Sequence, residues 1–146
     1  MNLHRHFETE LDSLKEKLLT MASLADAAVN RSIQALVERD DELARTVKAD
    51  DSQLDTLEME IDEQAITLLS KAPLAIDLRL ITVAMKISHD LERVGDEATT
   101  ISRRALELGQ EPQLKPYVDI PRMAKMGLEM LKEALDAFVR DRKSVV

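Results

Sequence analysis

Two pairs of acidic residues carry the clearest chemical signal in the sequence. Glu92 and Asp96 are four residues apart, and so are Asp51 and Asp55. In an α-helix of about 3.6 residues per turn, side chains at this spacing stack on one face. Carboxylate oxygens are hard ligands that suit magnesium, manganese, calcium or iron better than copper. The spacing therefore predicts two carboxylate pairs that could hold cations.

The two pairs are expected to meet across a helical hairpin. A turn expected at Pro73 lies midway between Asp51 and Asp96, and also midway between Asp55 and Glu92. In an antiparallel hairpin, residues equally distant from the turn lie at the same height. We therefore predict that all four carboxylates converge on one metal-binding face, which could hold more than one ion.

Other interpretations of these residues stay open. The chain has 28 acidic residues among 146, so acids four apart also arise by chance on a solvated helix face. By the same count from the turn, Glu58 lies opposite His89, which makes His89 a candidate extra ligand. A partly exposed structural histidine is the favoured interpretation of His89.

An enzymatic use of the carboxylates has little support. A ferritin-like di-iron enzyme needs Glu-x-x-His motifs, but Lys86 stands three residues before His89 and Leu3 stands three before His6. No glycine-rich phosphate loop is present, and no pattern predicts the enclosed pocket that acid–base catalysis by paired acids requires. We predict that the chain is not an enzyme. The alternatives are a carboxylate-based metal-dependent enzyme and a purely structural helical bundle.

The elements that position these acids are expected to be helices. Apolar residues recur at steps of three and four, and aromatic residues make up only 2% of the chain, which favours packed helices over a sheet. Asp40 or Asp41 should cap the second helix, and Gly109 should end the third. The predicted helices span about 2–37, 42–71 with a flaw near 50–51, 77–108 and 121–142. The predicted fold is all-α, an antiparallel three-helix bundle followed by a further helix.

Gly95 is an unusual residue for the middle of a helix. Glycine costs roughly 1 kcal/mol of helix propensity relative to alanine, and Gly95 stands between Glu92 and Asp96. A neighbouring helix or a ligand should therefore approach the backbone closely at this residue.

The fourth helix resembles the first. Met123-Ala124 repeats Met21-Ala22, and other apolar positions of the two helices coincide at the same offset. We interpret residues 1–109 as a three-helix repeat, 110–120 as a linker and 121–146 as the first helix of an incomplete second repeat, in a truncated chain.

Composition limits the partners and the compartment. The formal net charge of −8 leaves no surplus of basic residues for nucleic acid. The absence of cysteine excludes disulfides and thiolate metal sites and fits a reducing cytoplasm. No signal-peptide core and no apolar run of about 20 residues occurs. We expect a soluble, cytoplasmic, helical protein.

The acidic motifs resemble those of the PhoU family of phosphate-uptake regulators. Residues 77–83 (DLRLITV), 91–96 (LERVGD) and 101–105 resemble the third helix of that family, and residues 51–55 (DSQLD) resemble its second helix. The resemblance extends over essentially the whole chain, and the LERVGD block is its most specific part.

The resemblance implies a regulatory adaptor. It assigns the metal-binding role to Asp51, Asp55, Glu92 and Asp96. Members of the family have been associated with iron and zinc, and manganese and magnesium are further candidates for the bound ion. It also implies a negative regulator of the phosphate-starvation response, which links the ATPase of a phosphate ABC transporter to a sensor histidine kinase. Contact with the membrane would then occur only through these partners.

Self-association is a further expectation. The fourth helix carries an apolar stripe that no intrachain second repeat would cover. Because exposing such a stripe to water is unfavourable, we predict a homo-oligomer, in the simplest case a dimer formed by pairing fourth helices. The stripe consists of Met123, Met126, Met130, Ala134 and Ala137.

Overall fold

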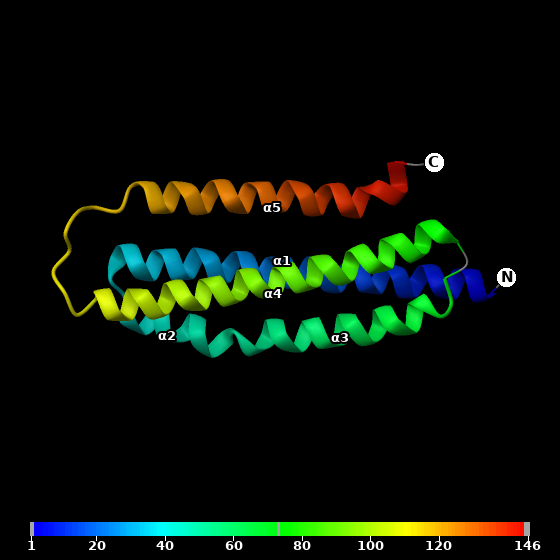
Figure 1. The fold of residues 1–146 in the computed structure, drawn as a ribbon, viewed down its shortest axis with the longest axis horizontal. Helices are drawn as coiled ribbons and strands as arrows, with labels where there is room; N and C mark the ends of the chain where they lie inside the picture. Colours follow the sequence, from blue (N-terminus) through cyan, green and yellow to red (C-terminus); the bar gives the residue numbers. More distant parts are fainter. Residues whose placement is uncertain (1, 73, 145–146) are drawn as a thin grey trace.

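The computed structural model describes residues 2–72 and 74–144 and folds them into five helices (Figure 1). The helices are α1 Asn2–Glu38, α2 Asp41–Asp50, α3 Ser52–Leu69, α4 Ala75–Leu108 and α5 Asp119–Ser144. The described part of the chain contains no strand, so the predicted all-α fold is confirmed.

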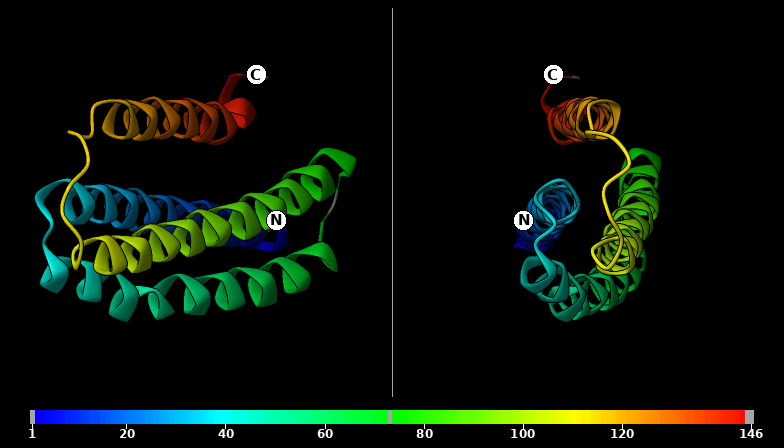
Figure 2. Two further views of the ribbon diagram at one scale, coloured as in Figure 1. Left: turned by 60° about the vertical axis from the view of Figure 1, so that its left-hand side comes forward. Right: turned by 90° about the vertical axis from the view of Figure 1, so that its left-hand side faces the viewer.

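The first four helices form a bundle of three rods. α2 and α3 follow one another along one rod, which runs antiparallel to α1 and to α4 (Figures 1 and 2). The contact between α1 and α4 is the most extensive of the bundle. α5 returns along the outside of the bundle after a long connection and packs against α1 (Figure 2).

The core is built from the predicted apolar stripe of α1. Its members at the centre of the bundle are each at most 1% exposed, and they pack with Ile61 of α3 and with Ile81 and Leu91 of α4. Burying one such side chain contributes about 1.5–3 kcal/mol relative to leaving it in water. This packing fixes the heights of α3 and α4 relative to each other. The buried stripe of α1 comprises Leu11, Leu14, Leu18, Met21 and Ala25.

The flaw expected near residues 50–51 is a break between two helices. Asp51 ends α2 and begins α3 with φ −60° and ψ −31°, so the chain bends without leaving the right-handed region. Asp40 caps α2 as expected, because its side chain accepts a hydrogen bond of 3.0 Å from the Leu43 N–H. The predicted second helix is therefore two consecutive helices.

The start of α4 lies close to the predicted position. Leu74 has an extended backbone, and the helix begins at Ala75, slightly before the expected residue 77. Pro73, where the turn was predicted, lies outside the described part of the chain. Asp77 lies fully buried in the first turn of α4, where a carboxylate interacts favourably with the helix dipole.

The C-terminus of α4 is held by a residue that the sequence did not indicate. Gly109 ends the helix as predicted, but with φ −61° rather than in the left-handed region. A Cβ at Gly109 would lie 2.7 Å from Asp41 Oδ1, so close approach explains this glycine. The guanidinium of Arg39 donates hydrogen bonds to the carbonyls of Leu108, at 3.2 Å, and Gly109, at 3.3 Å.

α5 begins near the end of the predicted linker. The helix starts at Asp119, and Pro121 lies in its first turn, where proline is tolerated. The division into a repeat at 1–109, a linker at 110–120 and a second incomplete repeat at 121–146 remains a prediction. Among the described residues, no helix combines the length and the apolar character that crossing a membrane requires.

Candidate metal centre

α3 and α4 approach each other closely at Gly95. This glycine is buried, and a Cβ added to it would overlap with the Cδ1 atom of Leu54. Leu54 lies between Asp51 and Asp55 on the facing helix. The neighbouring helix that Gly95 was expected to admit is therefore α3, and both acidic pairs flank the point of contact.

The four predicted carboxylates lie together beside this contact. Asp51 interacts electrostatically with Asp55 on its own rod and with Asp96 on α4. Glu92 shares side-chain hydrogen bonds with Asp96 and with Asp55 across the helix pair. These interactions pair Asp51 with Asp96 and Asp55 with Glu92 across the two helices, which are the pairs that the count from the turn gives. Among the described residues, three potential ligand atoms converge at Glu58, His89 and Glu92, but at no three of the four predicted carboxylates, so the predicted four-ligand site stays a prediction.

Mutual repulsion and burial change the proton affinity of two of these groups. Partial burial raises the pKa of Asp51, and the charges of Asp55 and Asp96 raise it further, while a hydrogen bond from Thr99 acts in the opposite direction. Burial, followed by the hydrogen bond and charge of Asp96, raises the pKa of Glu92 to about 7. Asp51 and Glu92 therefore bind their protons more tightly than isolated carboxyl groups do.

In the described part of the chain, no basic side chain forms an ion pair with one of the four acids Asp51, Asp55, Glu92 and Asp96. Clustered carboxylates without cationic partners are destabilising at neutral pH unless protons or metal ions neutralise them. The donor set therefore fits a hard or borderline cation.

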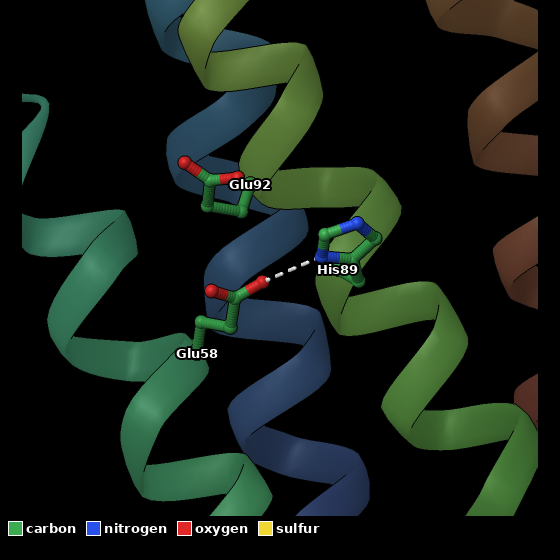
Figure 3. A group of neighbouring side chains, drawn as sticks. All are labelled: Glu58, His89 and Glu92. Carbon is green, nitrogen blue, oxygen red and sulfur yellow. Dashed lines mark hydrogen bonds and ion pairs between the residues drawn. The ribbon is translucent and has the colours of Figure 1, made fainter.

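A nitrogen donor lies next to the carboxylates. Glu58 of α3, together with His89 and Glu92 of α4, places three potential ligand atoms within 4.8 Å of one another (Figure 3). His89 Nδ1 lies 3.3 Å from Glu58 Oε2. His89 is exposed, in agreement with its interpretation as a partly exposed structural histidine. It nevertheless contacts Glu58, the residue that lies equally far from the predicted turn on the facing helix.

The centre is largely open to solvent, and only Asp51 at its edge also lines a small cavity of about 130 Å³ beside Leu54 and Gly95. Asp55 and Asp96 are exposed to solvent, whereas Asp51, Glu58 and Glu92 are half-buried. Acid–base catalysis would need a substrate held away from bulk water. The arrangement of these carboxylates is suited to binding ions, with water completing each coordination shell.

Comparison with known proteins identifies relatives of the chain. A family model described as "PhoU domain" matches residues 18–105. The chain is 39% identical over 141 residues to the phosphate-specific transport system accessory protein PhoU homolog of Pseudomonas putida, covering 95% of this chain and 55% of that protein. It is 33% identical over 145 residues to the phosphate-specific transport system accessory protein PhoU of Escherichia coli, covering 96% and 60%.

A solved structure agrees with these matches. The crystal structure of PhoU from Pseudomonas aeruginosa superposes with a TM-score of 0.87 and 39% sequence identity, over 92% of this chain and 65% of that one. The chain spans 55% to 60% of the length of the two relatives named above. Sequence and fold together establish that the chain belongs to the PhoU family.

Proposed function

We propose that this chain acts as an accessory protein of phosphate-specific transport, as the names of its relatives state for those proteins. In this role it is a cytoplasmic adaptor that links the ATPase of a phosphate ABC transporter to a sensor histidine kinase and restrains the phosphate-starvation response. The adaptor works by docking rather than by catalysis, and it reaches the membrane only through these partners.

The adaptor carries a metal-binding face formed by Asp51, Asp55, Glu92 and Asp96. The observation that supports this face most strongly is the convergence of the two acidic pairs across the α3–α4 contact, where the pKa of Glu92 rises to about 7. A divalent ion, with iron, zinc, manganese and magnesium as candidates, would neutralise this charge and tie α3 to α4 at Gly95.

Calorimetry tests the metal face. We expect Mn²⁺ to bind the wild-type chain, and Asp55→Ala or Glu92→Ala to weaken that binding at least about tenfold, because each removes a direct ligand. Glu63→Ala is the matched control, since Glu63 is an exposed acid of α3 beyond the cluster. Equal Mn²⁺ affinity in the wild type and in all three variants would remove the metal face from the proposal.

Binding assays with purified partners test the adaptor role. We expect the chain to be retained by the immobilised transporter ATPase and by the sensor kinase. The complete Escherichia coli relative serves as the positive control, because the chain covers only 60% of that protein. Retention of the control but not of this chain would show that docking needs residues which this chain does not contain.

A further inference from the structure

We propose that Glu58, His89 and Glu92 form a distinct binding position for a borderline divalent cation such as Zn²⁺. This position adjoins the all-oxygen ligands of Asp51, Asp55 and Asp96 and shares Glu92 with them. The inference rests on the proposed metal face, and it adds a nitrogen ligand that changes which metal the face prefers.

The three side chains converge from two helices. His89 and Glu92 are three residues apart on α4, so they project from the same side of that helix, and Glu58 faces them from α3 (Figure 3). Their ligand atoms lie within 4.8 Å of one another. Ligands around a tetrahedral Zn²⁺ ion, bound at about 2.0–2.1 Å, are about 3.3 Å apart. Small side-chain rotations would close the remaining gap without moving either helix.

The histidine gives this position a different chemistry from the rest of the face. Imidazole nitrogen favours zinc, iron, nickel and copper, whereas carboxylate oxygens alone favour magnesium, calcium and manganese. The Nδ1 atom of His89 already faces Glu58 Oε2 at 3.3 Å, and the other ring nitrogen points away from Glu58 (Figure 3). A metal ion bound at Nδ1 would take the place of the contact between His89 and Glu58 Oε2, and the neutral metal-bound ring would carry its proton on Nε2.

A simple histidine–glutamate ion pair is the competing explanation, and the chain contains one for comparison. His6 Nε2 lies 2.8 Å from Glu10 Oε1 within one helix. Among the described residues, the group of Glu58, His89 and Glu92 is the one in which three such ligand atoms converge. The third ligand, Glu92, distinguishes this group from the His6–Glu10 pair.

Nitrogen-15 NMR of the histidine rings, combined with calorimetry on the full chain, tests the inference. We expect Zn²⁺ to shift the Nδ1 resonance of His89, whereas Mg²⁺ leaves it in place. His89→Ala should weaken Zn²⁺ binding at least about tenfold and leave Mn²⁺ binding unchanged. Glu58→Gln, which keeps the side-chain size, should also weaken Zn²⁺ binding. His6→Ala is the matched control and should change neither affinity.

The outcomes separate this inference from the proposed function. If His89→Ala and Glu58→Gln both bind Zn²⁺ as the wild type does, the nitrogen-containing position is wrong, whatever happens at the other acids. If Asp51→Ala and Asp55→Ala both leave Mn²⁺ binding intact while His89→Ala loses Zn²⁺ binding, the all-oxygen face fails and this position stands. A His6→Ala variant that loses Zn²⁺ as strongly as His89→Ala would also overturn the inference.

Discussion

At the level of single residues, Glu92 connects the acids of the predicted metal face with Glu58 and His89. It shares hydrogen bonds with Asp96 and Asp55 and lies near the charge of Glu58. One of its carboxylate oxygens also lies within 4.8 Å of a ring nitrogen of His89. A carboxyl group with neighbours of the same sign binds its proton more tightly than it would in the unfolded chain. The cost of gathering these acids should therefore be visible in the dependence of stability on pH.

The raised pKa of Glu92 predicts that the metal-free protein loses stability as pH rises. The pKa is about 7 in the folded chain against an ordinary value of 4.5, so between these two values the folded state holds more protons than the unfolded state. The free energy of unfolding then decreases as pH rises through this window. Asp51, whose pKa is also raised, contributes in the same direction at lower pH.

Urea unfolding in the presence of a chelator measures this effect. The wild type should be more stable at pH 5 than at pH 8, and Glu92→Gln should flatten the difference, because glutamine does not titrate. Saturating Mn²⁺ should restore stability at pH 8, where protons no longer neutralise the acids. A wild type and a Glu92→Gln variant with the same pH dependence would contradict the assignment of the effect to Glu92.

At the level of helices, Gly95 and Gly127 provide a matched test of how α3 and α4 pack. A methyl group at Gly95 would overlap with Leu54, which is buried, whereas a methyl group at Gly127 on α5 would meet no atom within 4 Å. Overpacking a core costs typically about 1–3 kcal/mol, and replacing a helical glycine by alanine gains about 1 kcal/mol of propensity.

The two substitutions should therefore shift stability in opposite directions. We expect Gly95→Ala to lower the free energy of unfolding by about 1 kcal/mol, and Gly127→Ala to raise it by up to about 1 kcal/mol. Chemical denaturation measures both values. If Gly95→Ala stabilises the protein as much as Gly127→Ala does, α3 and α4 do not approach as closely as the structure indicates.

Sequence periodicity predicts these helices well because it reports which face each one buries. The stripe from Leu11 to Ala25 is buried as predicted. Asp55 and Glu92, which are equally far from the predicted turn, lie next to each other in the structure. The role of Arg39 could not be predicted, because its guanidinium binds carbonyls about 70 residues away in sequence. Likewise, the count from the turn pairs Glu58 with His89 but does not reveal that Glu92 completes a set of three ligands.

At the level of the whole molecule, α4 separates two surfaces of different chemistry. One side of α4 presents Glu92 and Asp96 together with the acids of α3. Another side presents Val94 and Ile101 to an apolar cavity of about 670 Å³ between α4, α1 and α5. The first surface is suited to cations and the second to an apolar partner. Binding of ions and binding of protein can therefore use separate faces of one helix.

The exposed methionines of α5 lead us to expect self-association through this helix. Met123, Met126 and Met130 are 67%, 57% and 68% exposed, and contiguous apolar surface in water favours association. Sedimentation velocity should show a concentration-dependent dimer of the wild type. A double variant, Met123→Glu with Met130→Glu, should shift the equilibrium toward monomer, because pairing would bury the new charges.

Met59→Glu is the control, since Met59 is 64% exposed but lies on α3, away from α5. It should leave the dimer intact, and circular dichroism should show unchanged helix content in every variant. A wild-type chain that sediments as a monomer at high concentration would contradict pairing through α5. Equal dissociation by the Met59 variant would instead place the contact on the face of α3, where it would compete with the acidic surface for space.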